Sequence, residues 1–209
     1  MKNLRIQEYC HILNNKVVLN GNVYFESSNP DDLAVFLKEV FKFSGISYPK
    51  FYKMDDISKL GFLAAELLLQ NNIHKGFQPE EVGLVFSNSQ STLVTDRLFQ
   101  ESINDFQNFY PSPSVFVYTL PNIMLGEISI RHQMRGENAF FIFEKFNADF
   151  ISEYSNQLFL SKKLKAVVGG WVDQSDENYE AFLYFAAPFE KGVNVEHNEE
   201  QMNKLYNFK

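Results

Sequence analysis

Apolar positions along the chain recur in two patterns, and each pattern predicts one type of element. Where the intervals are three and four residues, helices are predicted over about 31–41, 55–69, 95–108, 121–134 and 147–161. Asp31 and Asp32 open the first helix, and either Asp55 or Asp56 can cap the second. The side chains expected to face inward in the first three helices are Leu33, Phe36, Leu37, Val40, Phe41, Leu60, Leu63, Ala64, Leu67, Leu68, Leu98, Phe99, Ser102, Ile103 and Phe106.

Short apolar runs bounded by polar residues predict the strands between these helices. The expected strand ranges are 81–86, 139–143, 164–168 and 180–187. Nearer the N-terminus, Asn14-Asn15 and Asn20-Gly21 interrupt apolar runs and are typical of hairpin turns. Because strands alternate with helices, we expect an α/β fold with a mainly parallel sheet covered by helices on both faces.

Prolines and glycines mark the expected ends of several elements. Pro111-Ser112-Pro113 predicts a turn, and Pro121 suits the first position of a helix, where its missing N–H costs nothing. Gly136 is expected to end that helix. Gly169-Gly170 is expected to end a strand.

Length and composition fit one soluble domain. Apolar residues make up 45% of the 209 residues, enough to bury a core, so we expect one domain over 1–189 and a peripheral polar tail over 190–209. The formal net charge of -7 argues against nucleic acid or an anionic membrane as a partner, since both are bound through clustered Lys and Arg. No run approaches the roughly 20 apolar residues of a membrane helix, and the first residues do not resemble a signal peptide. A cytoplasmic protein is expected.

Cys10 is the only cysteine, which excludes an internal disulfide and a Cys-based metal cluster. The histidines, His11, His74, His132 and His197, lack the spacing of metal ligands, and no metal or cofactor is expected. Cys10 and His11 lie in a β-like segment, where neighbouring side chains point to opposite sides. We therefore interpret Cys10 as a partly buried structural residue and not as a nucleophile.

Three segments carry a family resemblance, in order along the chain. Pro111–Gly136, PSPSVFVYTLPNIMLGEISIRHQMRG, resembles the ketosynthase stretch in which a Pro- and aromatic-rich turn leads to a Pro-Asn helix start, a Gly, an Ile-x-Ile-Arg-like run and a closing Arg-Gly. Lys53–Leu69 is similar to the family's Met-Ser-x-x-x-x-Leu-Ala helix, and Leu164–Asp173, LKAVVGGWVD, to its Asp-x-Ala-x-x-Gly-Gly-x-Asp strand end. With Glu81–Thr92, these segments span most of the chain. The sequence thus resembles the N-terminal half of β-ketoacyl synthases.

The resemblance implies the first βαβαβαββ half of a thiolase-like fold. The family's two histidine-bearing segments lie in the second half, and neither a His-Gly-Thr-Gly-Thr nor a Lys-x-x-x-Gly-His pattern occurs here. The family's nucleophilic cysteine follows the closing glycine after a strand. Counting nine residues on from Gly136 gives Lys145, and counting back from Gly169 gives Glu144. Neither position holds a cysteine.

Loss of this cysteine changes the chemistry that is possible. A thiolate is a strong nucleophile and a good leaving group, and a helix N-terminus lowers its pKa. A carboxylate at 144 would form a reactive mixed anhydride, and an amine at 145 would form an amide too stable to turn over. The missing histidines also remove the usual means of stabilising the enolate formed from malonyl. The resemblance therefore implies a pseudoenzyme.

Glu144 and Lys145 have two interpretations. At a strand–helix junction they can form a solvated turn, in which Glu near a helix N-terminus suits the helix dipole. Alternatively, one of them plugs the former acyl site, as a polar residue does in chain-length-factor-like subunits. The residues that could line a residual pocket there are Tyr118, Thr119, Phe143 and Phe146. For Tyr118 and Thr119, core packing is the safer interpretation.

Two further features have structural interpretations. The polar loop Ser87–Thr92 precedes a helix, and such a loop can present N–H groups to an anion. It lacks the glycines of a phosphate loop, so we interpret it as a capped connection. Trp171 is interpreted as a packing residue.

The apolar strand of residues 139–143 predicts an interface. Its residues match the strand that crosses the dimer axis in ketosynthases; they are Ala139, Phe140, Phe141, Ile142 and Phe143. An exposed edge of this kind aggregates, so we expect it to pair with itself across a two-fold axis or with a full-length ketosynthase. The surface that would meet the missing half must likewise be covered by a partner or the tail, or have become polar.

Three functions fit these features. The first is a non-catalytic ketosynthase-like subunit, a partner of a condensing enzyme or a chain-length-factor-like protein, in fatty-acid or aryl-polyene-type polyketide biosynthesis. The second is an acyl-thioester enzyme with altered chemistry, such as hydrolysis or malonyl decarboxylation. The third is a module that binds acyl carrier protein. The lost nucleophile and the apolar edge favour the first.

Overall fold

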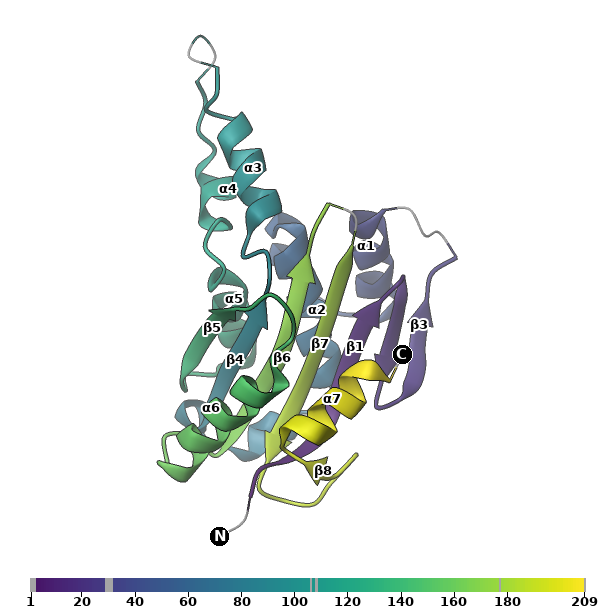
Figure 1. Cartoon of the computed structure of the whole chain (residues 1–209). Coiled ribbons are helices and arrows are strands. Elements are labelled where there is room, and N and C mark those ends of the chain that lie inside the picture. Colours follow the sequence, from purple (N-terminus) through teal and green to yellow (C-terminus); the bar gives the residue numbers. More distant parts are fainter. Residues whose placement is uncertain (1–2, 29–31, 106, 108, 177, 209) are drawn as a thin grey trace.

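A mixed sheet forms the centre of the computed structural model, which describes residues 3–28, 32–105, 107, 109–176 and 178–208. Asp31, Phe106 and residue 108, expected in two of the predicted helices, lie outside these residues. The strands are β1 (Arg5–Leu13), β2 (Lys16–Leu19), β3 (Asn22–Glu26), β4 (Val82–Asn88), β5 (Asn138–Ile142), β6 (Ala166–Gln174), β7 (Tyr179–Ala187) and β8 (Val195–Glu196). Their order across the sheet is β3-β2-β1-β7-β6-β4-β5, and β8 pairs with β1 (Figure 1).

The directions of the strands confirm the expected mainly parallel α/β sheet. β4 runs parallel to β5 and to β6, whereas β7 is antiparallel to both β6 and β1. β1, β4, β5 and β6 therefore point the same way, and β7 runs against them. β2 and β3 extend the sheet as antiparallel hairpins. The two predicted turns are present, with positive φ at Asn14, Asn15, Asn20 and Gly21.

Helices cover both faces of this sheet (Figure 1). The helices, including the short 3-10 turns, are α1 (Leu33–Phe43), η1 (Pro49–Lys53), α2 (Asp56–Leu68), η2 (Ile73–Gly76), η3 (Pro79–Glu81), α3 (Leu93–Glu101), α4 (Pro113–Val117), α5 (Ile123–His132), α6 (Ala148–Leu160) and α7 (Glu199–Asn207). α1, α2 and α5 share one hydrophobic cluster, and α6 and α7 share the other. The side chains of Asp32 and Asp55 cap α1 and α2, as expected from the sequence, and Asn147 caps α6.

The segment between β4 and α5 differs from its prediction. The expected helix over 95–108 ends at Glu101, and Leu98, expected to face inward, is exposed. The predicted turn at Pro111–Pro113 begins α4 instead, which Ser112 caps. α3 and α4 project beyond the end of the sheet, so their apolar side chains have no sheet to pack against (Figure 1).

Gly136, Gly169 and Gly170 do not end the elements that they were predicted to end, because each is required for close tertiary packing instead. α5 begins at Ile123, two residues after Pro121, and ends at His132; its C-cap is Gln133, whose φ is 57°. Gly136 instead packs against the backbone of β4, where a Cβ would lie 2.5 Å from the Val82 carbonyl oxygen. Gly169 and Gly170 lie inside β6 and do not end it, since a Cβ at either position would strike β7.

The polar tail is not peripheral. Val193 N–H donates to the Gln7 carbonyl at 2.7 Å, β8 pairs with β1, and α7 lies across the sheet beside α6. Met202, on α7, is fully buried in the same hydrophobic cluster as Ile6 and Phe182. The tail therefore covers a sheet face that residues 3–187 alone would leave open.

Candidate functional site

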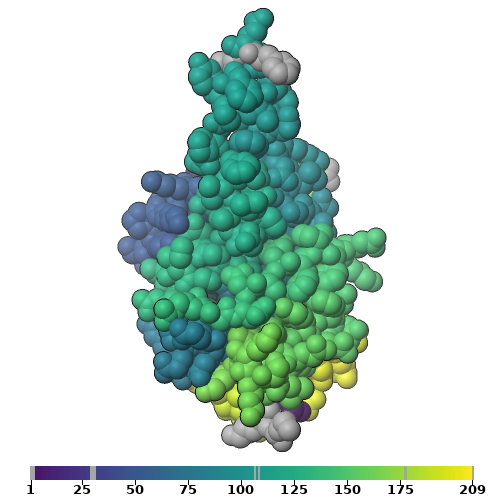
Figure 2. All heavy atoms as spheres, turned by 90° about the vertical axis from the view of Figure 1, so that its left-hand side faces the viewer, coloured from purple at the N-terminus to yellow at the C-terminus, as the bar shows by residue number. Residues whose placement is uncertain are grey.

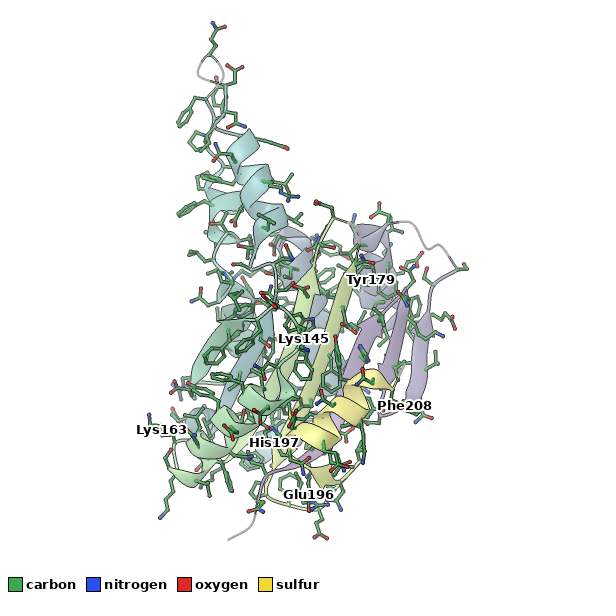
Figure 3. The ribbon with its side chains drawn as sticks, in the orientation of Figure 1. Lys145, Lys163, Tyr179, Glu196, His197 and Phe208 are labelled. Carbon is green, nitrogen blue, oxygen red and sulfur yellow. The ribbon has the colours of Figure 1, made fainter. Side chains whose placement is uncertain are left out.

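The turn between β5 and α6 holds Glu144 and Lys145, the two residues that the family resemblance aligns with the nucleophile. Phe143 N–H donates to the Asn88 carbonyl at 2.9 Å, which fixes the start of the turn. Asn147 ends it, because its side-chain oxygen accepts from Phe150 N–H at 3.0 Å and caps α6. Glu144 and Lys145 are both exposed between these two anchors. Figure 3 shows Lys145 on the sheet face that carries α6 and α7.

A cavity of about 610 Å³, here called the turn pocket, separates this turn from α7. Phe146 is the buried side chain of the turn, and its ring contacts Trp171, Phe182 and Tyr206 at centroid distances of 6.3, 5.6 and 4.8 Å. Trp171 is therefore a packing residue, as expected. The residues lining the turn pocket are Phe143, Glu144, Lys145, Phe146, Asn147, Ala148, Asp149, Glu199, Asn203, Tyr206 and Asn207.

Beside the turn pocket, α7 is bound to the sheet through Tyr206, which contacts Glu180 of β7 and His11 of β1. The Tyr206 hydroxyl donates to Glu180 Oε2 at 2.5 Å, and His11 Nε2 lies 2.8 Å from Glu180 Oε1. The His11 ring stacks on Tyr206 with a centroid distance of 5.7 Å. Burial raises the pKa of the Tyr206 hydroxyl, and its hydrogen bond to Glu180 raises it further. The phenol therefore stays protonated and serves as a donor, not as a base.

Two of the predicted pocket residues do not lie at the turn pocket. Tyr118 is buried in the hydrophobic cluster of α2 and α5, on the other side of the sheet from Phe146. Its hydroxyl lies 3.4 Å from Glu127 Oε1, and burial raises its pKa to about 12. The Thr119 carbonyl accepts from Thr92 Oγ1 at 2.8 Å. The structure thus joins Phe143 and Phe146 at one cavity and leaves Tyr118 and Thr119 elsewhere.

Cys10 is fully buried and belongs to the hydrophobic cluster on the α2 face. Burial raises the pKa of its thiol. His11, its neighbour, faces the opposite side and contacts Phe182 and Tyr206. The structural interpretation of Cys10 is confirmed, and this sulfur has no access to the turn pocket.

One polar cluster was not predicted from the sequence. Glu66, at 8% exposure, binds Arg131 through both carboxylate oxygens at 2.9 and 3.0 Å and lies 2.8 Å from His132 Nε2. The ring of His74 packs edge-on against His132 at 5.1 Å. The cluster joins two segments that are far apart in sequence, Glu66 with His74 and Arg131 with His132. Glu66 on a buried helix face was a usable signal, since a buried carboxylate requires a partner. In the described part of the chain, no three His, Cys, Asp or Glu side chains are arranged to hold a metal ion.

The polar loop after β4 is a capped connection, as interpreted. The Asp173 carboxylate accepts from Ser89 N–H at 3.0 Å, Ser89 Oγ at 2.7 Å and Gln90 N–H at 3.2 Å. A carboxylate from β6 thus fills the place that an external anion would need.

β5 is an edge strand in the described part of the chain, where it pairs only with β4. Phe140 packs against the cluster on the α2 face, whereas Ile142 is half exposed. Phe141 contacts Phe150 and Tyr154 of α6 at centroid distances of 4.8 and 5.1 Å. The five residues 138–142 leave one row of backbone groups open beside an aromatic surface.

Comparisons with known proteins now bear on this geometry. A scan with protein-family models and a search of curated protein sequences found no match. Among solved structures, the ishigamide ketosynthase/chain length factor is similar with a TM-score of 0.60 and 14% identity, over 88% of this chain and 62% of that chain. A ketosynthase (ApeO) in complex with its chain length factor (ApeC) from Xenorhabdus doucetiae has a TM-score of 0.56 and 10% identity, over 90% and 79%. A type II polyketide synthase acyl-carrier protein in complex with its ketosynthase has a TM-score of 0.59 and 10% identity, over 90% and 63%.

These similarities show that the chain has a ketosynthase-like, thiolase-like α/β fold. The chain spans 62% and 63% of the length of two of these proteins, so it has the fold without their full extent. No helix in the described residues is long and apolar enough to cross a membrane.

Proposed function

We propose that this chain is a non-catalytic ketosynthase-like subunit that pairs with an active ketosynthase in the cytoplasm. In this role it resembles a chain length factor of a fatty-acid or aryl-polyene-type polyketide pathway. One observation carries the proposal: the turn that matches the nucleophile position presents Glu144 and Lys145, while the only thiol is buried on the opposite face of the sheet.

The chemistry of the turn pocket supports the absence of condensation. Reversible acyl transfer needs a strong nucleophile whose acyl adduct survives until the chain is passed on. An exposed carboxylate is a weak nucleophile and forms a mixed anhydride that water hydrolyses, and an ammonium must first lose a proton and then forms an amide that does not release the chain. The Tyr206 hydroxyl at the pocket is hydrogen-bonded to Glu180. The remaining polar side chains that line the pocket are carboxylates and amides, and none is a cysteine, serine or threonine: Asn147, Asp149, Glu199, Asn203 and Asn207. The site therefore offers no second nucleophile to replace the cysteine.

The open edge supports the pairing. β5 has a free row of N–H and C=O groups, half-buried aromatic neighbours and no charged side chain within residues 139–142. Proteins cover such an edge, because a bare edge recruits other chains without selectivity. A ketosynthase with its own open edge strand would continue the sheet across the interface.

The proposal is tested by co-expressing the full chain with each ketosynthase encoded in the same genome. We expect a stable complex on size exclusion with one copy of each chain, and loss of that complex in Ile142→Lys, which places a charge on the edge. A matched control is Leu160→Lys, since Leu160 is equally exposed but lies on α6 away from β5. A chain that remains monomeric with every ketosynthase contradicts the proposal, and a complex with acyl carrier protein alone favours the binding-module alternative.

A further inference from the structure

The segment that carries α3 and α4, here called the arm (residues 93–105, 107 and 109–120), leaves the body of the molecule (Figures 1 and 2). Its contacts with the body lie at its base: Thr95 Oγ1 donates to Asp55 Oδ2 at 2.6 Å, Thr92 Oγ1 donates to the Thr119 carbonyl at 2.8 Å, and Tyr118 is buried in the cluster of α2 and α5. Arg97 also pairs with Asp176, and Phe99 meets Phe116 within the arm at 5.3 Å. α3 buries only Thr95, and α4 buries no residue. Helices of nine and five residues are marginal in water without packing, so the arm gains little stability from the rest of the chain.

Apolar side chains concentrate on the arm. Of the fifteen exposed large apolar side chains in the described residues, seven belong to it, although it is a small part of the chain. These seven are Leu93, Leu98, Phe109, Tyr110, Phe116, Val117 and Leu120. Soluble proteins seldom expose contiguous apolar surface of this kind unless another molecule covers it.

The arm is continuous with the open edge of the sheet. In Figure 2, the teal-to-green segment that contains α4, α5 and β5 runs down one face, from the arm to the body. Ile130 of α5 is 66% exposed and Ile142 of β5 is 51% exposed, so exposed apolar side chains accompany this segment from end to end. One partner seated on β5 would meet α4 without leaving this face.

The charges of the arm select the kind of partner. The arm contains Asp96, Glu101 and Asp105 but only one basic residue, Arg97, which already pairs with Asp176. A second copy of the chain would bring the same acidic surface against this one, within a molecule of net charge -7. A partner with basic residues around an apolar patch fits the arm better, since charge complementarity governs both encounter and register.

We propose that the arm is a clamp: the ketosynthase subunit that pairs with β5 is also gripped by α4, whose apolar side chains lie on an apolar patch of the partner with a basic rim. This inference rests on the proposed function and adds a second contact region to it. The edge strand supplies backbone pairing, which is tolerant of sequence, and the arm supplies side-chain selectivity.

The test uses the full chain and the ketosynthase recovered in the co-expression experiment. The arm variant is Val117→Glu with Leu120→Glu, and the matched control is Phe208→Glu, an exposed apolar residue labelled on the far side of the molecule in Figure 3. We expect the arm variant to bind at least about tenfold more weakly and the control to bind like the original chain. Far-ultraviolet circular dichroism and thermal melting confirm that both variants fold.

A photo-crosslinker tests directly which protein contacts the arm, without a measurement of affinity. Benzoylphenylalanine in place of Val117 should attach to the ketosynthase, whereas the same group in place of Phe208 should not. Unchanged affinity of the arm variant, with no crosslink from position 117, overturns the clamp and leaves the proposed pairing intact. Failure of the original chain to bind any ketosynthase overturns both. A homodimer of the purified chain that Leu120→Glu dissociates overturns the assignment of the arm to a different partner.

Discussion

The two faces of the sheet are built in different ways. On one face, α2 buries eleven of its thirteen residues against β1, β6 and β7, and its packing is almost wholly apolar. On the other, the nine-residue α7 buries one side chain completely and is held by hydrogen bonds among Tyr206, Glu180 and His11. The first face is a complete domain interior. The second is a surface that the chain closes with its own tail.

This difference shows how the described residues close both faces of the sheet. A bare sheet face would expose apolar side chains of β1, β6 and β7, and α7 covers them with a small apolar contact and a few directed polar bonds. It also leaves β5 as the edge at which a partner can add, because α7 occupies the face and not the edge.

Removal of α7 should have the largest effect. A chain that ends after Asn198 loses Met202, Leu205 and Tyr206, and we expect its free energy of unfolding to fall by more than about 4 kcal/mol. Binding of a hydrophobic dye should rise as the sheet face opens. The control ends after Asn207, which keeps α7. Equal melting temperatures for the two truncations would mean that the tail is not part of the fold.

A core substitution on the other face should be somewhat milder. Leu63 is fully buried on α2, and Leu63→Ala should cost about 3 kcal/mol through lost burial and a cavity, measured by urea unfolding. Because no face opens, dye binding should not change. Leu160→Ala, at an exposed position on α6, should cost little. If Leu63→Ala instead bound the dye strongly, the two faces would not differ as described.

Acid should weaken the α7 face through His197. Its Nε2 lies 2.9 Å from the Tyr184 hydroxyl and its Nδ1 3.2 Å from Asn156 Oδ1, and burial lowers its pKa to about 4. The unfolded chain, with a histidine pKa near 6.5, binds the proton more tightly, so stability falls as pH drops from about 6.5 toward 4. Between pH 6.5 and pH 5 this residue should cost about 2 kcal/mol.

The measurement compares urea unfolding of the original chain and of His197→Gln at both pH values. The variant is less stable at pH 6.5, but it should lose less stability on acidification. Parallel pH profiles for the two chains would show that His197 is not buried as a neutral ring.

The sequence predicted those features that depend on neighbours in the chain. Asp32 and Asp55 cap helices, and the Asn-Asn and Asn-Gly turns form, because each acts on backbone within a few residues. Gly169 and Gly170 were misread, since their role is to admit Tyr184 and the Phe182 carbonyl from a different strand. Tyr118 packs in the core, which was the safer of its two interpretations, and it lies on the other side of the sheet from Phe146.

The tail carried a signal that was overlooked. Met202, Leu205 and Tyr206 recur at intervals of three and four residues, which is the pattern of a helix with one apolar stripe. This pattern was overlooked because the tail around these residues is mostly polar. For the arm, the pattern predicted a longer helix with Leu98 facing inward, but α3 ends at Glu101 and Leu98 is exposed, because no sheet lies beneath the arm.

A smaller loss of stability is expected when the hydrogen bond between Tyr206 and Glu180 is removed but the apolar contacts of α7 are kept. Tyr206→Phe keeps the ring against Phe146 and removes the hydroxyl that donates to Glu180, so we expect a loss of about 1–2 kcal/mol. Tyr52→Phe, at an exposed tyrosine, is the control. No difference between the variants in thermal melting would mean that the hydrogen bonds do not fasten the tail.

The smallest effect is expected at the turn itself. Glu144 and Lys145 are exposed, so Glu144→Ala and Lys145→Ala should each change the free energy of unfolding by less than about 0.5 kcal/mol. If either residue carried altered thioester chemistry, hydrolysis of acyl-carrier thioesters would fall with its loss. We expect no such activity to lose, and a turnover abolished by one of these substitutions would favour the enzyme alternative.

The central claim is that this fold lacks a group able to accept an acyl chain. The most direct measurement is intact-protein mass spectrometry of the purified chain after incubation with acyl-carrier thioesters, with and without malonyl carrier. We expect an unchanged protein mass and no elongated product. A covalent acyl adduct, or an extended chain formed by this protein alone, would contradict the account.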